Sequence, residues 1–204
     1  MNGRILINKN NLINNLSEIK KLSPKSKVMS MIKSNAYGHG MLEVANLLSK
    51  SDAFAVATIE EAKYLRDNNI AKEIICLQGF SNSDEYIYCS KNNIRPVVHD
   101  MYQINIIENT NLSKKIKLWI KIDTGMNRLG FHNSIFKKVF DKCKNNKNIE
   151  QPLGIMTHLA CADEDEDNFS DKQISLLENI VSDINIELSI FNSAGIIKYS
   201  KKFE

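Results

Sequence analysis

The stretch Lys117-Leu-Trp-Ile-Lys-Ile-Asp123 has the alternating pattern of a β-strand with two different faces. Because side chains alternate across a strand, three aliphatic residues share one face and three other residues share the opposite face: Leu118, Ile120 and Ile122 against Trp119, Lys121 and Asp123. In a barrel the aliphatic face would contact the surrounding helices and the polar face would line the interior. A lysine in an interior is costly unless it is paired or chemically altered, so a structural Lys121–Asp123 pair and a modified lysine are both compatible with the pattern.

Further short apolar segments lie on both sides of this stretch and alternate with segments of helical period. Together they give seven predicted strands, over residues 27–33, 53–57, 73–77, 95–99, 117–123, 153–158 and 187–191. Strict alternation of strand and helix predicts a parallel sheet with right-handed crossovers. The fold class predicted is α/β, with seven of the eight strand–helix units of a (β/α)₈ TIM-type barrel. An open doubly wound sheet is the alternative, which a strand count does not exclude.

Several helix starts can be predicted from capping residues. Asp100 precedes a helical segment that carries Ile104 and Ile107, and Ser170 or Asp171 could cap the helix with the apolar stripe Ile174, Leu177, Val181 and Ile184. An additional helix over residues 12–22 is predicted before the first strand, ending ahead of Pro24.

The composition limits the classes of function. Hydrophobic residues are 43% and charged residues 25%, as in an ordinary globular domain, and the net charge of +3 is too small to predict a nucleic-acid partner. No apolar run approaches the roughly 18 residues needed to span a membrane, so no membrane association is expected. The four cysteines form no CxxC pair and the N-terminus has no signal-peptide pattern, which together predict a cytoplasmic protein with reduced thiols.

Polar groups follow three of the predicted strands. Lys33 ends the first strand and runs into a segment with Gly38 and Gly40, His158 ends the sixth, and Asn192-Ser-Ala-Gly195 follows the seventh. Taken singly, these residues can be a surface lysine, a hydrogen-bonded histidine and a helix cap. Because the carboxyl ends of barrel strands meet at one rim, together they predict a ligand site. No HExxH, Walker A or GxGxxG sequence is present, and no metal is expected.

Four blocks of sequence resemble the alanine racemases. Met31-Ile-Lys-Ser-Asn-Ala-Tyr-Gly-His-Gly40 is very similar to the signature around the lysine that carries pyridoxal 5′-phosphate (PLP) in that family. The other three blocks follow in the family's order: Ile120-Lys-Ile-Asp-Thr-Gly-Met-Asn-Arg-Leu-Gly-Phe131, Met156-Thr-His-Leu-Ala-Cys-Ala-Asp-Glu164 and Asn192-Ser-Ala-Gly195. The resemblance covers nearly the whole chain.

The resemblance implies a PLP-dependent isomerase that interconverts L-alanine and D-alanine for peptidoglycan synthesis, assembled as a homodimer. It implies that Lys33 binds PLP covalently and exchanges a proton with the substrate. The other implied roles are contact with the cofactor phosphate by Tyr37, Asn192 and Ser193, a hydrogen bond to the PLP phenolic oxygen by Arg128, and packing against the pyridine ring by His158. Lys121 would be the lysine that many members carry as a carbamate, and an anionic carbamate would orient Arg128 by charge-assisted hydrogen bonds.

The resemblance also implies a β-rich C-terminal domain. In the family dimer, a tyrosine from this domain of one subunit acts as the second base in the active site of the other. That domain and the eighth barrel strand have no counterpart in residues 1–204, which are therefore predicted to be an incomplete barrel domain with weak activity or none. Two alternatives are a PLP-binding barrel protein of PLP homeostasis without racemase activity, and a remnant of a split gene that folds poorly. The residues around Lys33 and Arg128 favour the racemases.

Overall fold

Seven parallel strands form one curled sheet in the computed structural model, which describes residues 6–164, 168–182 and 184–200. The ends of the domain predicted over residues 1–204 lie outside these ranges. The strands are β1 (Met29–Met31), β2 (Ala53–Val56), β3 (Glu73–Cys76), β4 (Ile94–Val98), β5 (Trp119–Lys121), β6 (Gly154–Met156) and β7 (Glu187–Ser189). Each pairs in parallel with the next along the chain, so the strand order never reverses as it does in a doubly wound sheet. The predicted barrel-type fold is confirmed, with β1 and β7 as the edges of the described sheet.

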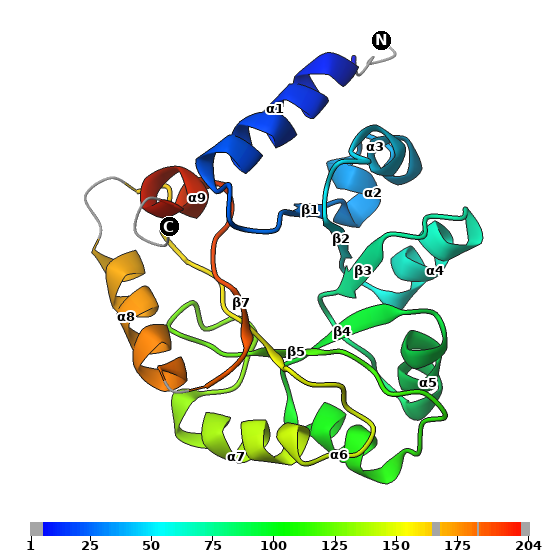
Figure 1. Cartoon of the computed structure of the whole chain (residues 1–204), viewed down its shortest axis with the longest axis vertical. Helices are drawn as coiled ribbons and strands as arrows, with labels where there is room; N and C mark the ends of the chain where they lie inside the picture. Colours follow the sequence, from blue (N-terminus) through cyan, green and yellow to red (C-terminus); the bar gives the residue numbers. More distant parts are fainter. Residues whose placement is uncertain (1–5, 165–167, 183, 201–204) are drawn as a thin grey trace.

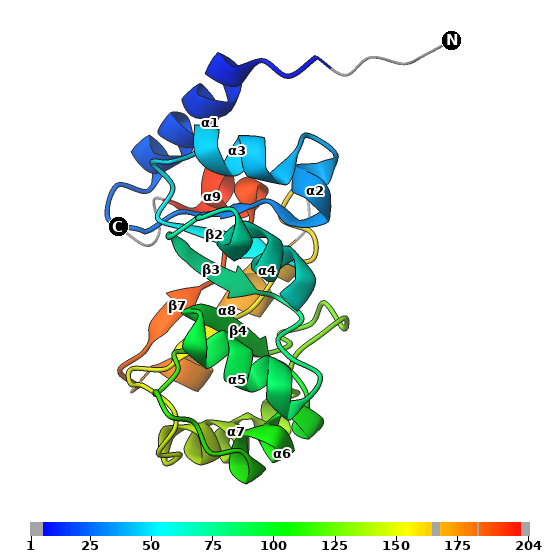
Figure 2. The same ribbon diagram turned by 90° about the vertical axis from the view of Figure 1, so that its right-hand side faces the viewer.

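Helices follow the strands and lie around the outside of the sheet (Figure 1). In the described part of the chain they are α1 (Lys9–Leu22), α2 (Lys33–Tyr37), α3 (Met41–Leu47), α4 (Ile59–Asp67), α5 (Ser83–Lys91), α6 (Met101–Asn109), α7 (Asn133–Lys144), α8 (Phe169–Val181) and α9 (Ser193–Tyr199). Helices α1 and α9, near the two ends of the chain, lie side by side (Figure 1, Figure 2). No helix among the described residues is both long and apolar enough to cross a membrane.

The helix starts agree with the capping predictions in part. Asp100 caps α6 in a capping box with Gln103, as predicted. The prediction for α8 is wrong, because this helix begins at Phe169 after Asn168, and both Ser170 and Asp171 lie within its first turn. The first helix begins earlier than predicted, since the Asn8 side chain accepts the N–H of Asn11 and caps it.

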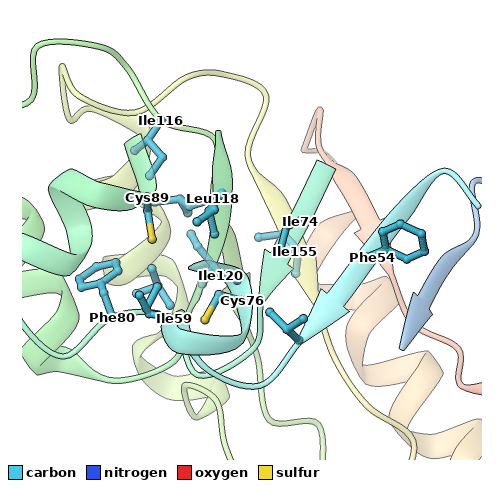
Figure 3. Close-up of a cluster of buried hydrophobic side chains, with 14 of the residues drawn as sticks. Phe54, Ile59, Ile74, Cys76, Phe80, Cys89, Ile116, Leu118, Ile120 and Ile155 are labelled. Atoms are coloured by element: carbon cyan, nitrogen blue, oxygen red, sulfur yellow. The ribbon is translucent and has the colours of Figure 1, made fainter. Parts of the chain in front are cut away.

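The two faces of β5 lie in different parts of the core, as the alternation predicts. Leu118, Ile120 and Ile122 are buried in the large cluster between the sheet and the helices. Figure 3 shows Leu118 and Ile120 with part of this cluster. Trp119 lies on the interior side of the sheet, in a smaller cluster with Ala53, Ala55, Ile75, Val97 and Met156. Each large aliphatic side chain buried in this way contributes about 1.5–3 kcal/mol. Lys121 lies on the same interior face as Trp119 and is 9% exposed. The small apolar cluster around Trp119 therefore supports its position at the site.

Candidate functional site

Lys33 lies just beyond the first strand rather than at its end. The predicted strand 27–33 is longer than β1, which stops at Met31. Ile32 is buried and its N–H still bonds to the carbonyl of Ala55 on β2, so the sheet register continues for one more residue. Lys33 then begins α2, where the chain turns at the carboxyl rim of the sheet. The half-buried lysine is therefore at the expected rim, but on a turn.

The turn after Lys33 is left-handed. Ser34, Asn35, Ala36 and Tyr37 all have φ between 53° and 54°, and Gly38 and Gly40 continue with φ of 86° and 90°. A left-handed conformation costs roughly 1–2 kcal/mol for each residue with a Cβ, so four in succession need strong local support. Such strain persists where surrounding structure over-determines it, which is a feature of functional sites.

Hydrogen bonds from outside the turn supply that support. The two carboxylate oxygens of Glu61 on α4 accept the N–H of Ser34 at 2.6 Å and the N–H of Ala57, after β2, at 2.7 Å. The side chain of Asn35 accepts the N–H of Met41 at 2.8 Å. Glu61 thus ties the residue directly after Lys33 to the carboxyl end of the neighbouring strand. Sequence reasoning missed this role, since Glu61 looks like any acidic residue in the first turn of a helix.

Lys121 is the last residue of β5, and its amine is buried. Burial and, after it, the positive charge of Arg128 lower the pKa of Lys121 from 10.5 to about 8, although the charge of Asp123 opposes the shift. The Asp123 carboxylate accepts the N–H groups of Gly125 and Asn127 at 2.8 and 3.1 Å, so it is engaged in ordering the following loop. These observations weigh against the structural Lys121–Asp123 pair, because a strong pair would raise the pKa of the lysine.

Arg128 lies on a loop that leaves β5 and returns to it. The N–H of Phe131 bonds to the carbonyl of Lys121, and the N–H of Asp123 bonds to the carbonyl of Phe131. Gly130 allows this closure, because a Cβ there would lie 2.7 Å from the backbone nitrogen of Asp123. The loop therefore holds Arg128 over the end of β5, with its side chain accessible to a ligand.

His158 follows β6 by two residues and is half-buried. Burial lowers the pKa of His158 from 6.5 to about 4, helped by the positive charges of Lys121, Arg128 and Lys33. The imidazole is therefore neutral near pH 7. The three cations lie at or after the ends of β5 and β1, and their charges all act on this one ring after β6.

A small enclosed cavity of about 10 Å³ lies at this point of the rim. Lys121, Arg128 and His158 line it together with Ile122, Asp123, Met126, Leu129 and Thr157. Lys33, Tyr37, Asn192 and Ser193 do not line the cavity. Tyr37 is 60% exposed, and Asn192 caps α9 by accepting the N–H of Gly195 at 2.8 Å, which orders the turn that presents Ser193. Three of the seven predicted residues thus line the cavity together, and the other four lie outside it.

Comparison with known proteins identifies the family. Residues 7–204 match the family model described as alanine racemase, N-terminal domain. The chain belongs to the alanine racemase family. An alanine racemase from Coxiella burnetii is 42% identical over 193 residues, which are 95% of this chain and 53% of the relative. One from Shewanella amazonensis is 36% identical over 189 residues, 90% of this chain and 52% of the relative. The chain spans about half the length of these relatives.

Solved structures of the racemase family have the same fold. The biosynthetic alanine racemase of Pseudomonas aeruginosa superposes with a TM-score of 0.87 at 27% identity, covering 93% of this chain and 53% of that one. The alanine racemase of Acinetobacter baumannii superposes with a TM-score of 0.86 at 29% identity, covering 95% of this chain and 54% of that one. A histidine racemase from Leuconostoc mesenteroides gives 0.84 at 24% identity, so the fold itself does not specify which amino acid is the substrate.

Proposed function

We propose that this chain is the cofactor-binding barrel of a PLP-dependent alanine racemase, an isomerase that interconverts L-alanine and D-alanine for peptidoglycan synthesis. The observation that carries the proposal is that Lys121, Arg128 and His158 line one cavity at the rim. Burial, together with the charges of Lys121, Arg128 and Lys33, lowers the pKa of His158 there to about 4. The relatives named above are racemases, which favours this function over a PLP-homeostasis protein.

The residues at the rim fit PLP chemically. The aldehyde group of PLP would bind covalently to a lysine amine, and Lys33 lies half-buried just after the first strand. A neutral His158 can pack against an aromatic ring without adding charge, while the exposed guanidinium of Arg128 can donate to the phenolic oxygen. The hydroxyl groups of Tyr37 and Ser193 can bind the phosphate, with Asn192 holding the turn at α9. When bound, PLP delocalises the negative charge left at Cα of an amino acid. Lys33 would remove or return the proton on one face of that carbon.

Lys121 fits the carbamate that the family resemblance implies. With a pKa of about 8, its amine is neutral more often than that of an exposed lysine. A neutral amine attacks CO₂ through its nitrogen lone pair, forming a C–N bond and releasing one proton, so R–NH₂ and CO₂ give R–NH–COO⁻ and H⁺. The product is an anion that would face Arg128 across the cavity and fix the direction of the guanidinium.

We further propose that the racemase acts as a homodimer in the cytoplasm. Removal and return of the proton on opposite faces of Cα needs a second base, which the family resemblance assigns to the C-terminal domain of a partner subunit. Cys76, Cys89 and Cys143 are buried thiols, which fits a reducing compartment.

The test is covalent trapping of PLP. The purified chain is mixed with PLP, reduced with borohydride and digested, and mass spectrometry locates the pyridoxyl group. The adduct is expected on Lys33 and is expected to disappear in Lys33→Ala, while a surface control, Lys9→Ala, should keep it. In D₂O with PLP, alanine should gain deuterium at Cα faster with the original chain than with Lys33→Ala. An adduct on Lys121 in place of Lys33, or one that persists at the same level in Lys33→Ala, would overturn the proposal.

A further inference from the structure

A fully buried glutamine lies beneath the candidate site. Gln173 on α8 is 0% exposed, and every hydrogen-bonding group of its side-chain amide has a partner. Its Nε2 donates to the carbonyl oxygen of His158 at 3.1 Å and to Oγ1 of Thr124 at 3.2 Å. Its Oε1 accepts the N–H of Ala160 at 2.9 Å. One side chain thus contacts both the segment that carries His158 and the loop that follows β5.

The partners fix the orientation of this amide. If the amide were flipped, its NH₂ group would face the N–H of Ala160 and its oxygen would face the carbonyl of His158, so two hydrogen bonds would become repulsive contacts. The observed orientation is therefore the only one compatible with both backbone partners. Gln173 holds the chain immediately on either side of Leu159.

Two buried threonines extend the connection towards Lys121. The Thr157 hydroxyl donates its one hydrogen to the carbonyl of Ile122 at 3.1 Å, so in its 2.8 Å contact with the Thr124 hydroxyl it must accept. The Thr124 hydroxyl therefore donates to Thr157 and accepts from Gln173. The result is a directed chain from Gln173 through Thr124 and Thr157 to the residue after Lys121. Such buried chains are rigid because each group satisfies the next.

We propose that Gln173 is a positioning residue of the site, which sets the His158 segment at a fixed place relative to the loop that carries Arg128. That this positioning serves catalysis rests on the proposed PLP function. That Gln173 fixes the place of the His158 segment does not. The last backbone bond described between the two strands runs from the N–H of Ile122 to the carbonyl of Met156 at 2.9 Å, before either Thr124 or His158 is reached.

The test replaces Gln173 by methionine, which has a similar length and no hydrogen-bonding amide. The readout is the pKa of His158 in the chain without PLP, followed by NMR and assigned with His158→Ala. The charged groups around this ring are Lys33, Lys121 and Arg128, with Asp123 in the same cavity wall. If Gln173 positions the segment, the pKa of His158 should rise from about 4 towards 6.5, by about one unit or more, as the ring leaves its buried, cationic surroundings. PLP binding should weaken about tenfold.

Gln103 provides a matched control. It is also 0% exposed, on α6, and its amide bonds to Gln78, Phe80 and His99 around the ends of β3 and β4. Gln103→Met should lower the unfolding temperature by a similar amount and shift the resonances of His99, but leave the pKa of His158 unchanged. If Gln173→Met lowers stability and the pKa of His158 stays at its original value, Gln173 is merely structural and the proposal is wrong.

A second variant covers the case in which Gln173→Met does not fold. Thr124→Val keeps the shape of the side chain and removes its hydrogen bonds with Gln173 and Thr157, but leaves Gln173 bonded to His158 and Ala160. The pKa of His158 should therefore rise by a smaller amount. An unchanged value in a folded Thr124→Val protein would contradict the proposal. If PLP fails to attach to Lys33 but the pKa of His158 responds as described, the proposed function falls and the positioning role stands.

Discussion

Arg95 on β4 reaches across the interior of the curled sheet to Glu187 on β7, with 2.5 Å between Nη1 and Oε2. The guanidinium is 5% exposed and lies over the ring of Trp119, 4.0 Å from its centroid. Gly154 on β6 leaves room for the stack, because a Cβ there would lie 2.4 Å from both Arg95 and Trp119. The last strand of the described sheet is thus joined to the middle of the sheet through its interior, as well as to β6 by hydrogen bonds.

Glu187→Gln should destabilise the chain more than Glu73→Gln. Both carboxylates face Arg95 and are about equally exposed, 40% and 39%, but Glu73 is 3.8 Å away. The two variants therefore differ mainly in the distance to Arg95, so their comparison measures how much the close pair contributes to stability. We expect a loss of about 1–3 kcal/mol for Glu187→Gln and well under 1 kcal/mol for Glu73→Gln, measured by urea unfolding. Equal losses would show that Arg95 does not hold β7 through this contact.

Gly130→Ala should be more harmful than Gly38→Ala. Both glycines have positive φ, +127° and +86°, so an alanine is strained at either position. At Gly38 no atom lies within 4 Å of the added Cβ, whereas at Gly130 backbone atoms of Asp123 and Ile122 lie at 2.7 and 2.9 Å. The clash should cost roughly 1–3 kcal/mol beyond the shared strain and should loosen the loop of Arg128. Unfolding free energies of the two variants, compared with the original chain, test the difference.

The overall fold could be predicted from sequence because its signals are local. The two faces of β5 and the alternation of strands with helices follow from short-range periodicity. The left-handed turn after Lys33 could not be predicted, since of its four residues only Asn35 is of a type that adopts positive φ with any frequency, and the turn depends on Glu61 from another helix. Gln173 was missed for a similar reason. It stands beside Ile174 on the buried side of α8, and periodicity does not distinguish a buried hydrogen-bonding amide from a polar residue at the helix boundary.

Glu61→Gln should loosen the turn after Lys33. The carboxylate accepts one N–H with each oxygen, but a glutamine amide has only one acceptor, so the N–H of Ser34 or of Ala57 would face an NH₂ group. We expect faster hydrogen exchange at these two amides and a loss of about 1–3 kcal/mol in unfolding free energy. Glu60→Gln, one residue earlier and exposed, is the control and should leave both exchange rates unchanged. Unaltered exchange in Glu61→Gln would contradict the role given to this carboxylate.

Lys121→Met should stabilise the chain without carbamate or PLP, and the gain should depend on pH. Burial and the charge of Arg128 lower the pKa of Lys121 from 10.5 to about 8, so between these values the unfolded chain binds a proton that the folded chain has released. The folded chain therefore carries no penalty from this lysine above pH 10.5. As the pH falls through about 8 the free energy of unfolding decreases, by roughly 3 kcal/mol in total. Methionine has no charge to bury, so its advantage should be largest below pH 8 and should shrink towards pH 10.5. Urea unfolding of both proteins across this range, in buffers purged of CO₂, measures the difference. An advantage that is constant with pH would show that the Lys121 amine is not held in a buried, cationic environment, and would remove the physical basis for its carbamylation.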